Sequence, residues 1–368
     1  MVGRILLIRL RQIGDVVFTT PAIRALHERY PQAQITYVVE PAAAPVVDGN
    51  PFINELVVAP NLRGLKGLRS DWTLGRRLRK QRFDLVIDFH GGPRASLLTW
   101  LSGAPVRIGY QVIGRAWVYT VRVNRPRQLR PRHSVENQWD LLAALGIGPP
   151  TPDRNPIEIP VDPHAAQAIG ERLSAAGVGD DDEVIVMHVS AGNPFRRWPG
   201  ESFTATAAAL VRGIERRRLI VTSGPSDAEA AKQVIDDARA RLTPPERSRI
   251  VDCGEISLAE LRALADRAAA YIGGDSGPMH VVSASTVPIV GLYGPTLPAR
   301  SAPWRPSRCS SAALEVNDLP CRPCDQRVCL PGDFRCLTRI GPDRVVGATT
   351  TVIAARSKSR GDDGRSKM

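Results

Sequence analysis

The sequence contains no apolar run that could cross a membrane. Its apolar runs, such as residues 5–8 and 85–87, are far shorter than the roughly 20 residues that a membrane-spanning helix needs. A short apolar segment follows the first four residues directly, and no small-residue cleavage site marks a signal peptide. We therefore expect the protein in the cytoplasm.

Signatures of nucleic-acid binding are also missing. Neither a helix-turn-helix motif, nor a zinc-finger repeat, nor an RNA-binding signature occurs in the chain. The pI of about 10.0 leaves a basic nucleic-acid-binding protein as the alternative from a different functional class. Steeply salt-dependent binding to random DNA would favour that alternative. The missing signatures predict that nucleic acid is not a partner.

Positive charge is concentrated in the first half of the chain. The net charge is +12, and residues 1–150 hold 21 lysines and arginines against 10 acidic residues. Most of this excess lies in two basic stretches, residues 63–82 and residues 107–132. Such a surface attracts anionic partners, among them phosphates, carboxylate sugars and anionic lipids. A basic surface that only keeps the protein soluble is the alternative.

Short β-rich runs alternate with helical patterns along the whole chain. This alternation predicts an α/β fold with parallel sheets, in two Rossmann-like domains of ordinary size. A segment rich in Pro and Gly, residues 146–163, is the expected linker. We place the first domain at residues 1–155, the second at 156–350, and a disordered polar tail at 356–368. A ligand cleft is expected where the two domains face each other.

Three motifs each follow a predicted strand and open a helix, at residues 9–16, 190–199 and 273–280. In open α/β folds, ligands bind at this end of the strands. Backbone N–H groups of Ser276 and Gly277 can hold a diphosphate, and an arginine fork at residue 196 or 197 matches phosphate oxygens. Asp15 has the alternative role of a helix cap. No G-x-G-x-x-G run occurs, so a dinucleotide fingerprint is absent.

Together the three motifs resemble glycosyltransferase family 9, the ADP-heptose:lipopolysaccharide heptosyltransferases. The resemblance runs over nearly the whole chain. It includes residues 84–88 with Gly91 and Arg94, residues 107–110, His133 with Glu136, residues 223–227 and residues 293–296.

The resemblance implies a GT-B fold and an inverting reaction that needs no cofactor. Asp15 matches the general base, which takes the proton of the acceptor hydroxyl. Arg196 matches a position that is usually Lys in the family, where it neutralises the donor diphosphate; the substitution keeps the charge and changes the geometry. The remaining donor-binding residues implied are Ser190, Asp227 near the ribose, Ile256 near adenine, and Asp275, Ser276, Gly277 and His280.

The resemblance also implies ADP-heptose as the donor and the inner core of lipopolysaccharide as the acceptor. We expect the two basic stretches to flank the acceptor site and to hold the enzyme peripherally on the inner face of the cytoplasmic membrane. The residues assigned to the acceptor are Arg76, Arg77, Arg79, Lys80 and Arg94. Within the same fold, another nucleotide sugar or a protein acceptor is the alternative.

Four of the six cysteines fall close together, at Cys321, Cys324, Cys329 and Cys336. We call residues 321–336 the Cys-rich segment. In a reducing compartment this spacing predicts a structural Zn²⁺ or iron site on four thiolates, with free or redox-active thiols as the alternative. Some members of the family resemble this chain in carrying such a segment. No catalytic role is expected for it.

Overall fold

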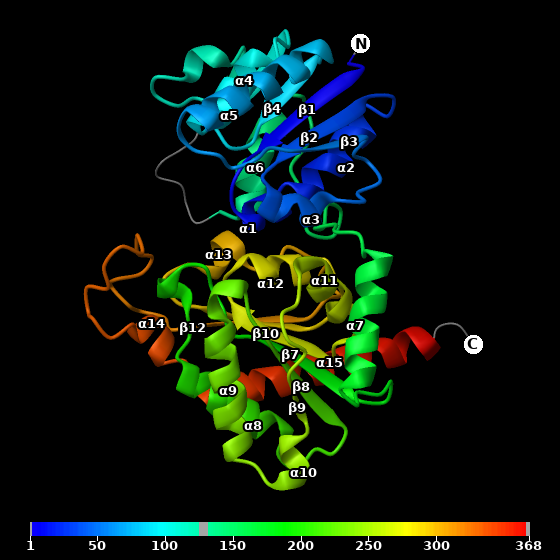
Figure 1. The fold of residues 1–368 in the computed structure, drawn as a ribbon, viewed down its shortest axis with the longest axis vertical. Coiled ribbons are helices and arrows are strands. Elements are labelled where there is room, and N and C mark those ends of the chain that lie inside the picture. The colour runs from blue at the N-terminus through cyan, green and yellow to red at the C-terminus, as the bar shows by residue number, and fades with distance from the viewer. Residues whose placement is uncertain (1, 125–131, 366–368) are drawn as a thin grey trace. The chain divides into compact units, whose positions relative to one another are not determined.

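A computed structural model describes residues 2–124 and 132–365, with side chains described up to residue 356. These residues fold as two compact units, one ending at Pro160 and the other beginning at Val161 (Figure 1). The predicted boundary between residues 155 and 156 lies slightly earlier, and both positions fall inside the predicted linker. Among the described residues, no helix combines the length and apolarity that a membrane crossing requires.

The first unit is built on a six-stranded sheet in which every strand pairing is parallel. Its strand order is β3-β2-β1-β4-β5-β6, the order of a Rossmann fold. The strands are β1 (Arg4–Arg9), β2 (Gln34–Val39), β3 (Glu55–Val58), β4 (Leu85–Asp88), β5 (Val106–Tyr110) and β6 (Val121–Val123). The order of the strands reverses between β1 and β4.

In the described part of this unit, six helices and two short 3₁₀ turns surround the sheet. They are α1 (Ile13–Val17), α2 (Thr20–Arg29), η1 (Pro41–Ala43), α3 (Ala44–Val47), α4 (Gly64–Lys80), α5 (Pro93–Leu101), η2 (Ala116–Val118) and α6 (Ser134–Ala143). The helical pattern of residues 15–30 predicts one continuous helix, whereas the structure divides this stretch between α1 and α2. The hydroxyls of Thr19 and Thr20 donate to the carbonyls of Val16 and Val17, which ends α1 before Pro21 opens α2.

The second unit repeats the plan with a second parallel sheet, ordered β12-β11-β10-β7-β8-β9. Counted from β7, this is the same Rossmann order, and it reverses between β7 and β10. The strands are β7 (Glu183–His188), β8 (Arg217–Thr222), β9 (Ile250–Val251), β10 (Ala270–Gly274), β11 (Ile289–Tyr293) and β12 (Ser311–Glu315). The α/β fold predicted from the strand pattern is confirmed for both units.

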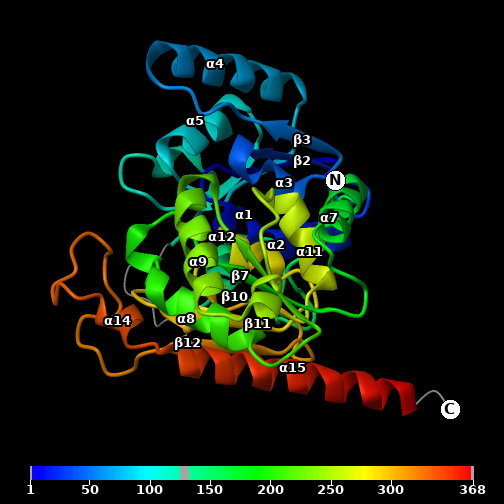
Figure 2. The ribbon, with the colours of Figure 1, turned by 60° about the horizontal axis from the view of Figure 1, so that its bottom comes forward.

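Helices cover both faces of the second sheet (Figures 1 and 2). They are α7 (Pro163–Ala175), α8 (Gly200–Val211), α9 (Ala228–Ala240), α10 (Pro244–Arg247), α11 (Leu258–Arg267), α12 (Gly277–Val282), α13 (Pro298–Ser301), α14 (Arg335–Thr338) and α15 (Pro342–Arg365), with the 3₁₀ turns η3 (Pro194–Arg196) and η4 (Pro225–Asp227). The structure continues α15 through most of the tail predicted to be disordered, because extending a formed helix adds one backbone hydrogen bond per residue. Residues 366–368 of that tail lie outside the described residues.

In the second unit, alternating residues of the strands pack into two separate hydrophobic cores, one on each face of the sheet. Ile185 and Met187 of β7 pack with the helices α8, α9 and α15 on one face. Val184 and Val186 pack with α7, α11 and α12 on the other face. Because both faces of the sheet are buried, the strands are apolar throughout, and polar side chains concentrate at the strand ends.

Candidate active site

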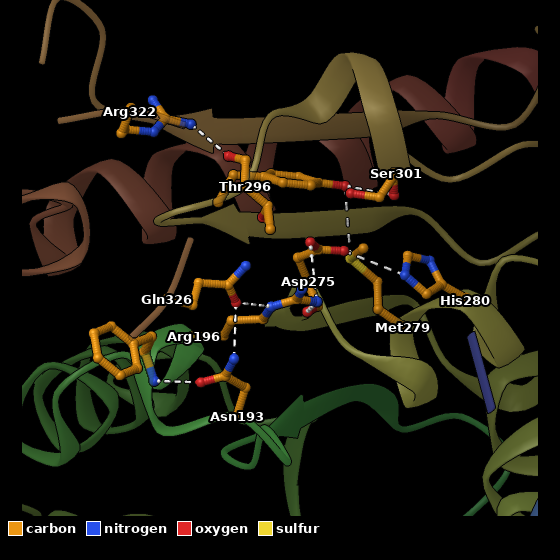
Figure 3. Close-up of polar contacts among 11 residues, drawn as sticks. Asn193, Arg196, Asp275, Met279, His280, Thr296, Ser301, Arg322 and Gln326 are labelled. Carbon is orange, nitrogen blue, oxygen red and sulfur yellow. Dashed lines mark hydrogen bonds and ion pairs between the residues drawn. The ribbon is translucent and has the colours of Figure 1, made fainter. Parts of the chain in front are cut away.

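The best-defined polar cluster of the second unit lies where its strand order reverses. Two loops meet there: the β7 loop, residues 189–199, and the β10 loop, residues 275–276, between β10 and α12. A Cβ atom on Gly274 would lie 3.1 Å from the backbone oxygen of Arg196, so glycine at this position lets the two loops approach closely. Two of the sequence motifs are thereby brought together. Figure 3 shows their side chains converging.

Arg196 is the cation of this cluster. Its Nη1 atom lies 3.1 Å from the backbone oxygen of Asp275 and 3.5 Å from the Asp275 carboxylate. Its Nε atom donates to the Oε1 atom of Gln326 at 2.7 Å (Figure 3). The side chain is 30% exposed, so the guanidinium is held in place and still reachable from solvent.

Asp275 is almost completely buried and bridges two cationic or polar neighbours. Besides Arg196, it contacts the Nε2 atom of His280 at 3.2 Å. Burial alone would raise the pKa of Asp275, but the hydrogen bond and charge of His280, together with the charge of Arg196, outweigh burial and lower it. Asp275 is therefore an anion that orients the two side chains beside it and cannot itself hold a phosphate.

The hydroxyl of Ser276, at the start of α12, is a buried hydrogen-bond donor. Within the part of the chain that the structure describes, its Oγ atom is buried and has no hydrogen-bond partner. A buried hydroxyl without a partner costs free energy unless a ligand or water satisfies it. Ser276 and Gly277 thus lie where the sequence predicted a diphosphate contact. The contact itself stays a prediction.

Asp227 and Ser190 are engaged with each other. The hydroxyl of Ser190 donates to the Asp227 carboxylate, and Arg197 forms an ion pair with the same carboxylate at 2.9 Å. These contacts use Asp227 to join the β7 loop to η4. Ile256, assigned to adenine, is half-buried and packs against the core on the side of α11. The roles of Ser190, Asp227 and Ile256 toward a donor remain predictions.

In the first unit, Asp15 lies in α1, just beyond the carboxyl end of β1. Its carboxylate pairs with Arg9 at 2.5 Å, and its side chain is 36% exposed, whereas that of Arg9 is 7% exposed. Arg9 is fixed in turn by a 2.6 Å hydrogen bond from Nη1 to the backbone oxygen of Phe89. Between the two, Arg11 and Gln12 have φ values of 67° and 53°, a strained backbone of the kind found at functional sites. Among the described residues, no side-chain hydrogen bond caps the start of α1, whose N-cap residue is Gln12, so Asp15 does not act as the cap.

The residues assigned to the acceptor fall into two groups. Arg76, Arg79 and Lys80 are exposed on α4, while Arg77 forms a 2.6 Å ion pair with Glu55. Arg94 is different, because its donors are taken up within the protein. They bind Asp71 at 2.8 Å, Glu40 at 3.2 Å and the Pro60 carbonyl at 2.7 Å. Arg94 joins α5 to α4 and to the ends of β2 and β3, and this geometry lends no support to its predicted contact with the acceptor.

The four cysteines of the Cys-rich segment are free thiols. Among the described residues, no group of three or more His, Cys, Asp or Glu side chains is placed so that it could hold a metal ion. Cys336 packs in the hydrophobic core of the second unit, and burial raises the pKa of its thiol. The predicted Zn²⁺ or iron clip is therefore unsupported by this structure.

Sequence reasoning missed Gln326 and did not decide between Arg196 and Arg197. Gln326 contacts Arg196 although the two lie 130 positions apart, and Arg197 pairs with Asp227. A glutamine in an irregular loop carries no sequence signal of such a contact. For Arg197, the sequence left open which of two neighbouring arginines faces the site.

Comparisons with known proteins agree with this architecture. A sequence model described as glycosyltransferase family 9 (heptosyltransferase) matches residues 72–332. The chain is 28% identical over 318 residues to a lipopolysaccharide heptosyltransferase 3 of Escherichia coli, covering 85% of this chain and 89% of that protein.

Two solved structures have a similar fold. A glycosyl transferase family 9 protein from Veillonella parvula superposes with a TM-score of 0.82 at 25% identity, covering 96% of this chain and 97% of that one. An ADP-heptose lipopolysaccharide heptosyltransferase II of E. coli superposes with a TM-score of 0.76 at 21% identity, covering 96% and 99% of the two chains. The second likeness bears on the fold alone.

Proposed function

The chain belongs to glycosyltransferase family 9, the heptosyltransferase family, and is a glycosyltransferase with the GT-B fold; from this premise we propose that it transfers heptose from ADP-heptose to the inner core of lipopolysaccharide. The proposed binding of the donor rests on the polar cluster of the second unit, which lies where the strand order reverses between β7 and β10. There, the partly exposed guanidinium of Arg196 contacts Asp275, and the hydroxyl of the next residue, Ser276, is buried without a hydrogen-bond partner among the described residues. Both groups are donors suited to a diphosphate.

The proposed reaction is a single displacement with inversion. The acceptor hydroxyl oxygen attacks the anomeric carbon of the heptose while the bond from that carbon to the diphosphate oxygen breaks. The leaving ADP carries away the electron pair of the broken bond. Asp15 accepts the proton of the attacking hydroxyl, a contribution of about 10²- to 10⁴-fold in reactions of this kind.

Charge stabilisation of the leaving group falls to the second unit. Negative charge grows on the diphosphate as the bond breaks, and donors fixed in advance stabilise it without reorganising. Arg196 supplies the positive charge, and Ser276 supplies a hydroxyl donor. Asp275 orients the side chains of Arg196 and His280, since it contacts both. By the family resemblance, the reaction needs no cofactor.

A membrane surface is the proposed location of the acceptor. On α4 the inward face carries Gly67, Asp71, Gly75 and Leu78. At 100° per residue, Leu65, Leu68 and Trp72 lie together on one flank of α4, about 100° around the helix from the inward face, and they are 85%, 61% and 48% exposed. Arginines 69, 76 and 79 accompany this apolar ridge on the same flank, and Arg76 lies 5.8 Å from the centre of the Trp72 ring.

An apolar ridge with cationic neighbours fits the interface of an anionic bilayer. Figure 2 shows α4 on the outer side of α5 within the first unit. The basic residues alone would suit any anionic partner, but exposed leucine and tryptophan beside them favour a surface with an apolar layer beneath the charge. We propose that α4 holds the enzyme peripherally on the inner face of the cytoplasmic membrane.

The donor is tested by turnover with ADP-heptose against ADP-glucose and UDP-sugars, using inner-core lipopolysaccharide that lacks the heptose to be added. Exclusive use of ADP-heptose supports the proposal, and preference for another nucleotide sugar rejects the donor. Transfer to a protein in place of the lipopolysaccharide rejects the acceptor.

The acceptor side is tested by reversing charge on α4. Arg76→Glu, Arg79→Glu and Lys80→Glu together should raise KM for the lipopolysaccharide and leave ADP affinity unchanged, because these side chains lie in the first unit. Unchanged acceptor KM at low salt would exclude α4 from acceptor binding. Arg77 is left intact in this variant because it pairs with Glu55.

A further inference from the structure

The Cys-rich segment contacts the β7 loop of the candidate donor site and the residues that follow β11. The backbone N–H of Cys324 donates to the Pro295 carbonyl at 3.2 Å, and Arg322 donates to the Thr296 carbonyl at 2.7 Å. The rings of Phe334 and Phe195 meet edge to face, with centroids 5.4 Å apart. The segment therefore contacts the chain just after β11 and the β7 loop at once.

The central contact of this segment is made by Gln326. Its Oε1 atom accepts from the Nε atom of Arg196 at 2.7 Å and from the Nδ2 atom of Asn193 at 2.9 Å (Figure 3). These two bonds use both lone pairs of the amide oxygen. Gln326 reaches this position from a backbone φ of 60°, a left-handed conformation that residues other than glycine rarely adopt.

The two bonds of Arg196 fix the direction of its guanidinium. One edge of the planar fork is occupied by Gln326 at Nε, and Nη1 is directed at Asp275. Among the described residues, no hydrogen bond from the Nη2 atom of Arg196 is recorded, which leaves that end of the fork for a ligand. Without Gln326, the guanidinium could rotate fully onto the buried Asp275 carboxylate and present less charge to an anion.

We propose that Gln326, on the Cys-rich segment, is a positioning residue that holds the Arg196 guanidinium toward the donor diphosphate. The inference rests on the proposed function for its ligand, and on the contacts above for its geometry. It gives the Cys-rich segment a task in donor binding that does not depend on any metal ion. The side chain of Gln326 touches no reacting atom in this account; it acts through Arg196.

A double-mutant cycle tests the coupling, with ADP as the titrant in calorimetry of the full chain. Gln326→Ala should weaken ADP binding about tenfold, the size expected for one hydrogen bond to a charged group. In the Arg196→Ala background, the same change should weaken binding less than about twofold, because the group that Gln326 orients is gone. Equal losses in both backgrounds, or no loss in the wild-type background, would overturn the proposal.

Val328→Ala is the matched control, since it truncates a side chain of the same segment that is 65% exposed. It should leave ADP affinity unchanged. An equal loss in this variant would mean that any disturbance of the segment affects the site, and would also count against Gln326.

A second measurement tests the contact between Gln326 and Arg196 without any nucleotide. In protein labelled with ¹⁵N at arginine Nε, the resonance missing from Arg196→Ala belongs to Arg196. Its Nε–H should exchange with water at least several-fold faster in Gln326→Ala than in the wild type, because the bond to Oε1 protects it. An unchanged exchange rate would refute the positioning role whatever the nucleotide is. Absence of ADP binding by the wild type would instead count against the proposed donor.

Discussion

The carboxylate of Asp15 lies 2.5 Å from the guanidinium of Arg9, which is itself anchored to the Phe89 carbonyl. The pair joins the carboxyl ends of β1 and β4, where the strand order of the first sheet reverses. Arg9 is buried and Asp15 is partly exposed, so the arginine fixes the direction in which the carboxylate faces solvent. This is the geometry that a positioned base requires.

Replacing Asp15 by asparagine should remove the proton acceptor and keep the shape of the side chain. We expect kcat to fall by about 10²- to 10⁴-fold. ADP affinity should stay within about twofold of the wild type, because the proposed diphosphate contacts lie in the second unit; both values come from steady-state assays and calorimetry. Asp48→Asn, an exposed aspartate of the same unit, is the control and should retain full turnover. An active Asp15→Asn enzyme would exclude Asp15 as the base.

Ser276→Ala should weaken ADP binding without lowering the free energy of unfolding. Because the Oγ atom has no partner among the described residues, removing it should leave the free energy of unfolding unchanged or slightly higher. ADP binding should weaken about fivefold to tenfold if the hydroxyl contacts the diphosphate. Calorimetric titration and denaturant unfolding measure the two effects.

Ser285→Ala provides the contrast for this prediction. The Ser285 hydroxyl is buried and donates to the Val282 carbonyl at 2.8 Å. Its loss should lower stability by about 1 kcal/mol and leave ADP affinity unchanged. If Ser276→Ala behaved like Ser285→Ala, the hydroxyl of Ser276 would have a structural partner and no role toward the donor.

The apolar ridge of α4 predicts a contribution to membrane binding beyond charge. Substituting Leu65, Leu68 and Trp72 by glutamine should lower partitioning onto phosphatidylglycerol vesicles at least tenfold, since each large apolar side chain contributes about 1.5–3 kcal/mol when fully buried. Vesicle flotation at physiological salt measures the bound fraction. The fold should survive, because all three side chains are exposed.

A control for the ridge uses exposed apolar residues elsewhere in the chain. Val328→Gln with Leu330→Gln, in the second unit, should leave vesicle binding unchanged. If the wild-type protein does not bind phosphatidylglycerol vesicles even at low salt, the membrane proposal is rejected. If binding depends only on the arginines and not on the apolar ridge, the interaction with the vesicles is electrostatic alone.

His188 predicts a loss of stability in weak acid. It is buried at the end of β7 beside Thr222, and burial lowers the pKa of its imidazole to about 4, partly offset by the charge of Asp227. Between pH 6.5 and pH 4 the unfolded chain therefore binds a proton that the folded chain does not, so stability falls as pH falls through this window.

From pH 7 to pH 5 this linkage amounts to about 2 kcal/mol. Denaturant unfolding at the two pH values should show that loss in the wild type, over and above the loss in His188→Asn, which cannot titrate. Equal pH dependence of the two proteins would mean that folding does not lower the pKa of His188.

Patterns local to the chain sufficed to predict the two Rossmann-like units and the position of the motifs. Apolar runs of strand length mark β1, β7 and β10, and each motif follows its strand directly. In parallel sheets the carboxyl ends of the strands share one edge, so the β7 and β10 loops had to be neighbours once the order of the sheet was known. The resemblance to a family then added roles that no pattern of residues could supply.

The sequence by itself determined which segments become strands and helices, because apolar periodicity and turn residues act over a few positions. Only the tertiary structure decided which polar side chains meet. It assigned Arg94 to Asp71 and Glu40, Arg197 to Asp227, and Gln326 to Arg196 across 130 positions. Each of these pairs depends on strand order and on the path of irregular loops, and the energy of one hydrogen bond or ion pair is too small to leave a trace in local sequence.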